Sequence, residues 1–251
     1  MNNSYDSFSR FYRELVYASG HIKLEQDLAL SLLSNFNINY DANILDAACG
    51  TGDVIAYLIS HGFYYSNGMD SSLGMLERAI ELLPQNHLMH LSWEELSSHS
   101  EMQNSYNVIF VLSLSLLHAD EKNIQQILRN FYGLLKNDGI LFFDNRKWIN
   151  DDENNLKEPH RDTQNNRFLQ HIYKDHNSYK IFDACTYKSN RQVVTYKIQP
   201  TGENSRIIEL DVSYMIKKSE EFLTLLFDIG FKTTSILASS TWPYQIIYAK
   251  K

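Results

Sequence analysis

The sequence lacks the features that mark secreted and membrane proteins. Its 251 residues contain only two cysteines, Cys49 and Cys185. Their wide separation argues against a disulfide framework and is typical of a reducing compartment. No apolar run is long enough to span a bilayer, and the polar stretch MNNSYDSFSR has no signal-peptide core. We therefore expect a soluble, cytoplasmic protein that does not act on a membrane.

Positive charge is also scarce. The formal net charge is -7, the sequence pI is about 5.7, and no basic run is present. Nucleic acid is therefore not an expected partner, because its phosphates would be repelled at long range. Aromatic residues are abundant instead, with 16 tyrosines and 13 phenylalanines. Tyrosine suits a half-exposed sheet surface, its commoner use, or a pocket for a cationic ligand.

The first part of the chain alternates between strand and helix patterns. Amphipathic stretches at 8–17 and 23–34 predict two N-terminal helices. The strands that follow are predicted at 44–47, 63–69, 87–91, 106–112 and 140–144, and their helices at 53–60, 72–83 and 121–136. This alternation predicts parallel strands joined by crossover helices, as in a Rossmann-like, doubly wound α/β fold.

The pattern changes after residue 145. A polar stretch at 150–166 is predicted to be a loop, and a mobile lid ordered by substrate. Strand-like runs follow at 168–174, 179–187, 192–198 and 207–216, and then a helix at 219–229 and strands at 232–238 and 244–250. We expect a mostly parallel seven-stranded sheet with an inserted antiparallel β flap and N-terminal helices. The predicted organisation is a single domain, 1–251, with a helical cap (1–40), a cofactor-binding core (41–145), a β-rich substrate flap (146–215) and the last core elements (216–251).

The stretch ILDAACGTGD, residues 44–53, lies where the first predicted strand meets its helix. Gly50 and Gly52 let the backbone pass close to a ligand, and the helix N-terminus offers unpaired N–H groups. A dinucleotide-binding turn would carry a third glycine where this chain has Ile55. A nicotinamide dehydrogenase is therefore the weakest of the alternatives.

Two acidic residues narrow the choice of ligand. Asp46 would repel a pyrophosphate but suits a cationic ligand. Asp70 ends the second predicted strand, twenty residues after Gly50, where a carboxylate can accept hydrogen bonds from a ribose diol. These features favour a ligand with a ribose, a positive charge and no phosphate.

At this point the sequence resembles the class I S-adenosylmethionine-dependent methyltransferases. LDAACGTG (45–52) is similar to their first motif, and MDSSLGMLERA (69–79) to their ribose-binding motif and its helix. FFDNRKW (142–148) and VSYMIKKSEEF (212–222) resemble segments of the glycine/sarcosine N-methyltransferase-like small-molecule methyltransferases. The resemblance implies S-adenosyl-L-methionine as cofactor and a small-molecule methyl acceptor.

The resemblance also implies individual roles. Arg146 would hold a substrate carboxylate, and Lys23 would lie near the methionyl end of the cofactor. Ser92 and Trp93 would flank the adenine. The implied catalytic set is Arg146, Tyr17, Tyr214 and His118. The implied cofactor-binding set is Tyr5, Tyr17, Lys23, Asp46, Ala47, Gly50, Gly52, Asp70, Ser71, Met75, Ser92, Trp93 and Leu112.

Several alternatives remain open. Ser113 and Ser115 stand where the glycine-methylating relatives carry G-N-S, which puts glycine in doubt as substrate but leaves a small amine. An amine acceptor needs no dedicated base, because an enclosed pocket lowers the pKa of its ammonium. His118 supports instead an O-methyltransferase in which it is the general base, although it also reads as a polar neighbour of Asp120.

Other interpretations concern partners and structural roles. The chain could be a non-catalytic cofactor-binding module, or a homo-oligomer whose N-terminal helices reach a neighbour's pocket. Arg146 could be paired with Asp144 rather than with a substrate, and Cys49 is interpreted as a small filler beside the backbone. The histidines show no metal-ligand spacing, so no metal is expected.

Overall fold

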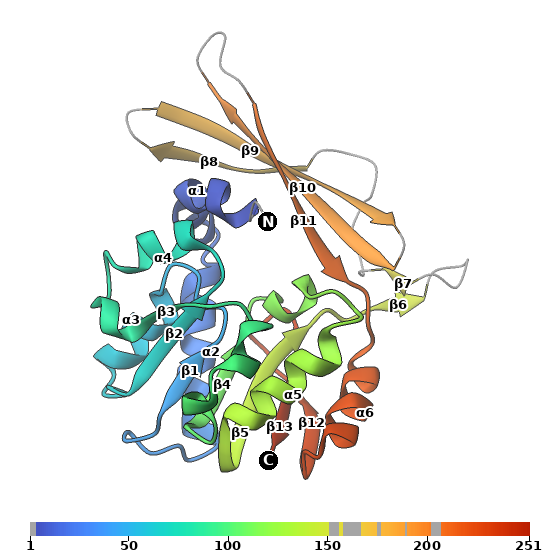
Figure 1. The fold of residues 1–251 in the computed structure, drawn as a ribbon. Coiled ribbons are helices and arrows are strands. Elements are labelled where there is room, and N and C mark those ends of the chain that lie inside the picture. The colour runs from blue at the N-terminus through green and yellow to red at the C-terminus, as the bar shows by residue number, and fades with distance from the viewer. Residues whose placement is uncertain (1–3, 151–155, 158–166, 175–176, 189, 202–206) are drawn as a thin grey trace.

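The computed structural model describes residues 4–150, 156–157, 167–174, 177–188, 190–201 and 207–251. A seven-stranded sheet forms the lower part of the molecule in Figure 1, with strand order β12-β13-β5-β4-β1-β2-β3. Its strands are β1 (Ile44–Asp46), β2 (Ser66–Asp70), β3 (Leu88–His90), β4 (Tyr106–Val111), β5 (Leu135–Asn145), β12 (Thr233–Leu237) and β13 (Gln245–Lys250). The five neighbouring strands β5, β4, β1, β2 and β3 pair in parallel, and β13 pairs antiparallel with β5 and β12. The predicted mostly parallel, seven-stranded fold is confirmed.

The sheet is buried on both faces, because alternate residues of each central strand feed different apolar clusters. In β4, Val108 and Phe110 join one cluster, whereas Ile109 and Val111 join the other. Helices α2 (His21–Asn35) and α3 (Asp53–Ser60) supply the first cluster, and α5 (Ile124–Leu134) and α6 (Ser219–Ile229) the second. α4 (Leu73–Ala79) follows β2.

A separate antiparallel sheet stands above this core in Figure 1, with strand order β11-β10-β9-β8. Its strands are β8 (Arg167–Lys174), β9 (Asn177–Lys188), β10 (Arg191–Pro200) and β11 (Ile208–Met215). Two short strands, β6 (Ile149–Asn150) and β7 (Leu156–Lys157), pair with each other. The predicted antiparallel set is confirmed, while most of the predicted loop at 150–166 lies outside the described residues.

Helix α1 (Ser4–Ala18) lies between the core and the antiparallel sheet (Figure 1). Phe8 stacks on Tyr196 of β10, and Phe11 meets Tyr179 of β9 edge to face. On its other side, Asp6 accepts hydrogen bonds from the Ser72 hydroxyl and from the Gly74 N–H at the start of α4. α1 thus joins the flap to the elements around the glycine turn.

Two predicted helices are longer than those in the structure. The helix predicted over 72–83 spans only Leu73–Ala79. The helix predicted over 121–136 spans only Ile124–Leu134, and β5 begins immediately after it at Leu135. The reason is the turn formed by Asp138, which adopts a left-handed φ of 63°, and Gly139. Residues 135–139 therefore belong to an irregular start of β5 rather than to a last turn of helix. No helix in the described part of the chain is both long and apolar enough to cross a membrane.

The close approach of α1 to α4 depends on Gly74. A Cβ atom at this position would lie 2.8 Å from Ser9 Oγ and 2.9 Å from the Asp6 carbonyl oxygen. We expect Gly74→Val to push α1 away and to lower the free energy of unfolding by about 1–3 kcal/mol. Thermal unfolding and protease cleavage within α1 would measure the effect. Leu73→Ala, at an exposed position of the same turn, is the matched control and should change neither.

Candidate active site

The turn after β1 has a backbone conformation that favours glycine. Gly50 and Gly52 adopt left-handed φ values of 51° and 78°, and Gly52 is the N-cap of α3. A Cβ on Gly52 would also lie 3.0 Å from both Ala79 Cβ and Leu83 Cδ1. The turn is therefore held tightly against the end of α4, with the first N–H groups of α3 beside it.

Asp70 fixes this turn to the end of β2. One of its carboxylate oxygens accepts the Gly50 N–H at 2.9 Å, and the other accepts the Ser72 N–H at 2.8 Å. Burial raises the pKa of Asp70, and the two backbone N–H groups oppose that rise. The carboxylate thus lies at the mouth of the turn, where the sequence predicts a partner for a ribose diol.

A hollow next to the turn is lined by acidic and hydroxyl side chains from several elements. They include Tyr12, Glu25, Asp46, Asp53, Ser113 and Ser115. Burial raises the pKa of Asp46 to about 7 and that of Glu25 to about 8, and neighbouring carboxylates add to both rises. Such a hollow repels anions and suits a cationic ligand.

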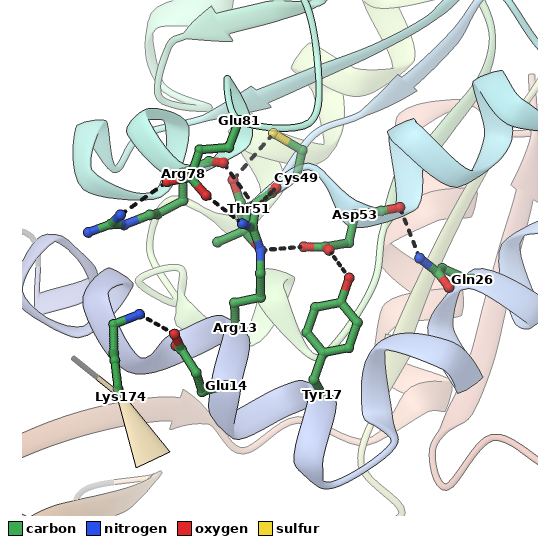
Figure 2. A network of polar contacts seen from close by, with 11 residues as sticks. Arg13, Glu14, Tyr17, Gln26, Cys49, Thr51, Asp53, Arg78, Glu81 and Lys174 are labelled. Atoms are coloured by element: carbon green, nitrogen blue, oxygen red, sulfur yellow. Dashed lines mark hydrogen bonds and ion pairs between the residues drawn. The ribbon is translucent and has the colours of Figure 1, made fainter. Parts of the chain in front are cut away.

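α1 covers the turn with a network of polar contacts, shown in Figure 2. Arg13 donates to the carbonyl oxygens of Thr51 (3.1 Å) and Arg78 (2.9 Å) and to the Glu81 carboxylate (2.8 Å). Its Nε also lies 3.7 Å from an Asp53 carboxylate oxygen. One α1 side chain therefore ties the glycine turn to α4.

The same helix is tied to α3 and to the flap (Figure 2). The Tyr17 hydroxyl donates to Asp53 at 2.8 Å, and Glu14 forms an ion pair with Lys174 at the end of β8. The Gln170 amide also donates to the Leu15 carbonyl oxygen at 3.0 Å. α1 therefore connects the flap to the glycine turn, so that a movement of the flap would also displace the residues that cover the turn.

On the flap side, an aromatic cluster surrounds the end of β5. Arg146 is 5% exposed, and its guanidinium lies over the rings of Tyr214 (4.7 Å) and Tyr244 (5.7 Å). The ring of His118 packs against Tyr214, 4.8 Å between centroids, and against Tyr5, 5.5 Å. The structure thus brings together four predicted site residues: Tyr5 from α1, His118 from the segment after β4, Arg146 directly after β5, and Tyr214 from β11.

The hydrogen bonds of His118 define its tautomer. Its Nδ1 lies 3.1 Å from the Ser213 carbonyl oxygen, which can only accept, so Nδ1 carries the proton. Its Nε2 is then the acceptor for the Tyr5 hydroxyl at 3.0 Å. Burial, with a smaller contribution from the nearby charges of Arg191 and Arg146, lowers the pKa of His118 to about 4. His118 is therefore a neutral imidazole that holds Tyr5, and a weak base.

Asp144 has a different role from the one considered in the sequence. Its carboxylate accepts the N–H groups of Ser113 (3.1 Å) and Leu114 (2.6 Å) and the indole N–H of Trp242 (2.8 Å). Ser113 and Leu114 both have left-handed φ values, 58° and 63°. Asp144 thus holds the unusual turn after β4, which places Ser113 in the hollow.

The remaining predicted residues lie near the ends of β1 to β4. The Trp93 indole donates to the carbonyl oxygen of Ala47 at 2.5 Å, and Met75 is buried at the start of α4. Ser92 donates to Glu95, the Ser71 carbonyl oxygen is 3.2 Å from His90 Nε2, and Leu112 is buried. Their positions along the ends of β1 to β4 agree with the predicted edge of the sheet.

Two predictions are not supported by the geometry. Lys23 points outward from α2, where its Nζ lies 2.6 Å from Asp27 and 4.9 Å from the centre of the Tyr57 ring. Tyr17 is 52% exposed and bonded to Asp53, and does not join the cluster around Arg146. The two lie on the outer sides of α2 and α1, a consequence of helix orientation that the sequence does not fix.

Four residues of the site were missed by sequence reasoning: Tyr12, Arg13, Glu25 and Asp53. Only Asp53 had a signal, since it directly follows the second glycine of the turn. Cys49 agrees with its predicted packing role, because a Cβ on Gly68 would lie 2.7 Å from its Sγ. Within the described ranges, no group of three or more His, Cys, Asp or Glu residues is arranged to hold a metal ion.

Comparison with known proteins agrees with this geometry. Residues 44–139 match the family described as a methyltransferase domain. Over 110 residues, 42% of this chain, the sequence is 33% identical to the glycine/sarcosine N-methyltransferase of Aphanothece halophytica. That match spans only 40% of the relative's length.

Solved structures extend the likeness to nearly the whole chain. An S-adenosylmethionine-dependent methyltransferase from Clostridium acetobutylicum is 18% identical with a TM-score of 0.67, and 99% of each chain is covered. An amino pentose methyltransferase from Micromonospora echinaspora, bound to S-adenosylmethionine, is 12% identical with a TM-score of 0.70 (94% of this chain, 96% of that one). These structures share the fold. Residues 44–139 are thus similar to a methyltransferase domain, and the solved structures show that the chain as a whole shares their fold.

Proposed function

We propose that this protein transfers a methyl group from S-adenosylmethionine to an amine nitrogen of a small molecule that also carries an anionic group. The observation that carries the proposal is the position of Arg146, buried among aromatic rings at the end of β5, close to the flap. The names of the relatives, a glycine/sarcosine N-methyltransferase and an amino pentose methyltransferase, support a nitrogen acceptor.

The cofactor would bind at the glycine turn, where the backbone is left-handed at Gly50 and Gly52. The Asp70 carboxylate would accept the ribose hydroxyls, and the acidic hollow would accept the positive charge of the cofactor. When bound, S-adenosylmethionine supplies a methyl group on a positively charged sulfur. Trp93, anchored on Ala47 at the same edge, would provide the face against which the adenine packs.

The acceptor end is formed by the cluster around His118. Arg146 would pair with the anionic group of the acceptor and so hold its amine in line with the methyl group and the sulfur. Such positioning can lower the activation barrier by about 7–11 kcal/mol. The aromatic walls exclude water and lower the pKa of the acceptor's ammonium, so that the nitrogen lone pair becomes free. The proton then leaves to water, and no protein base is needed.

The proposal is tested by turnover with methyl-labelled S-adenosylmethionine and a panel of amines in matched pairs, with and without a carboxylate. We expect methylated product from anionic amines and a lower kcat/KM for their neutral counterparts. Phenols and catechols with the same anionic group form the contrasting set. Product from that set alone would contradict the nitrogen acceptor.

His118→Gln separates nitrogen from oxygen transfer. Glutamine can accept from Tyr5 and donate to Ser213 but cannot take up a proton, so we expect kcat/KM to fall less than tenfold for an amine. A base for oxygen transfer would instead be worth about 10²–10⁴ in rate. His87→Gln is the matched control, since His87 Nδ1 also bonds a carbonyl oxygen, that of Ser66 at the start of β2, the opposite end of this strand from Asp70.

A further inference from the structure

Glu25 lies on the side of α2 that lines the hollow beside the glycine turn. Its carboxyl group accepts a hydrogen bond from the Ser113 hydroxyl. Ser113 Oγ in turn lies 3.0 Å from His21 Nε2, and the Ser113 N–H is held by Asp144. The position of the Glu25 carboxyl is therefore defined by the turn after β4.

Asp46 and Asp53 line the same hollow from the end of β1 and the start of α3. Among the described residues that line it, none is lysine or arginine. Burial raises the pKa of Glu25 and of Asp46, and neighbouring carboxylates add to each rise. A positively charged group in the hollow would stabilise the ionised form of both.

The cofactor carries two positive groups, an α-ammonium and a sulfonium, and only the ammonium has N–H groups to donate. Several carboxylate and hydroxyl oxygens facing one another match such a donor. A carboxylate held against the sulfonium would instead stabilise the ground state and stand beside a reactive methyl group as a competing nucleophile. The aromatic faces of Tyr5 and Tyr214 suit the sulfonium better.

We propose that the Glu25 carboxylate binds the α-ammonium group of S-adenosylmethionine and so positions the amino-acid end of the cofactor. This inference rests on the cofactor site of the proposed function. It does not depend on the acceptor, because binding is measured without one.

Binding of the ammonium should then be linked to a proton. The charged and titratable groups that face Glu25 come from four neighbouring elements and from α2 itself. They are Tyr12 on α1, Asp46 on β1, Asp53 on α3, Asp144 on β5, and His21 on α2, which acts through Ser113. With its pKa raised to about 8, Glu25 is mostly protonated at neutral pH in the free protein. An ammonium favours the ionised form, so cofactor binding below about pH 8 should release a proton and tighten as the pH rises.

The test is calorimetric binding of three ligands to the wild type and to Glu25→Gln. S-adenosylmethionine has both positive groups, S-adenosylhomocysteine has only the ammonium, and 5′-methylthioadenosine has neither. At about pH 8, where Glu25 is partly ionised and the ligand still carries its ammonium, we expect Glu25→Gln to weaken the first two by roughly tenfold and to leave the third unchanged. At about pH 6, proton release measured in buffers of different ionisation enthalpy should fall in the variant.

Other outcomes would overturn the assignment in distinct ways. Equal weakening of all three ligands would indicate a structural role, and weakening of S-adenosylmethionine alone would place Glu25 at the sulfonium. No weakening of any ligand would remove Glu25 from the site. Wild-type protein that binds none of the ligands would overturn the cofactor site itself. Asp27→Asn, at an exposed position on the same helix, is the matched control and should bind all three as the wild type does.

Discussion

Asp70→Ala is expected to weaken, by about 100-fold or more, the binding of every ligand that contains the cofactor's ribose. The wild-type carboxylate presents acceptor oxygens at the end of β2 and already orders the glycine turn through the Gly50 and Ser72 N–H groups. Hydrogen bonds to a charged acceptor contribute about 1.5–3 kcal/mol each, so the loss of a ribose diol corresponds to about 100-fold or more in the dissociation constant. Calorimetry with S-adenosylhomocysteine measures it directly.

The comparison with 5′-methylthioadenosine makes this prediction specific. This nucleoside retains the ribose, so Asp70→Ala should weaken it as much as S-adenosylhomocysteine, in contrast to Glu25→Gln. A loss confined to S-adenosylhomocysteine would contradict ribose binding by Asp70.

Asp70→Ala also removes the contacts that order the turn, and its effect on folding needs a separate measurement. Thermal unfolding without ligand gives the cost to the fold. Thermal unfolding with ligand shows whether the folded variant still binds, since a ligand at 100 times its dissociation constant raises the free energy of unfolding by about 2.7 kcal/mol. A variant that folds but gains no stability from the ligand isolates the binding defect. Asp70→Asn, which keeps one acceptor oxygen, should lie between the alanine variant and the wild type.

The glycine turn and Asp70 were predictable because their signals are local. Residues 44–53 and Asp70 follow directly from strands that the apolar pattern reveals, and a turn with left-handed φ values needs glycine wherever it occurs. The parallel sheet then brings the ends of consecutive strands to one edge without any further information. The fold class and the edge that carries the site therefore followed from the order of the elements.

The acidic hollow was not predictable in the same way. An amphipathic pattern defines which face of α2 is apolar, but not how that helix is rotated over the glycine turn. Lys23 and Glu25 illustrate the difference. They are two residues apart, about 200° around an α-helix, so only one of them can face the hollow. The structure selects Glu25, whereas the resemblance favoured Lys23.

Long-range polar contacts were also beyond the sequence. Arg13 reaches the turn, α4 and Asp53 because α1 crosses above them, and that crossing depends on the fit of Gly74 against Asp6. Asp144 is fully buried, and its partners come from the turn after β4 and from Trp242, 98 residues further along the chain. Such pairings are properties of packing rather than of spacing.

Arg146→Met is expected to remove the preference for anionic acceptors while leaving cofactor binding intact. Methionine keeps an unbranched side chain between the rings of Tyr214 and Tyr244 but has no charge and no N–H donor. Loss of one partner from a buried, hydrogen-bonded charge pair costs about 2–5 kcal/mol, which corresponds to about 30- to 5,000-fold in kcat/KM for an anionic amine. Steady-state kinetics with the matched pairs of amines measures this loss.

The neutral amine of each pair distinguishes loss of charge recognition from damage to the aromatic cluster. Because it has no anionic group to lose, its kcat/KM should be similar in the wild type and in Arg146→Met, so the two classes of acceptor converge in the variant. Arg146→Lys should recover part of the difference, since it restores the charge without the two-point geometry of the guanidinium. Arg167→Met, on the flap and paired with Asp183, is the matched control. An equal loss for charged and neutral amines would show that Arg146 supports the aromatic cluster rather than the acceptor's charge, and the class of substrate proposed here would then be wrong.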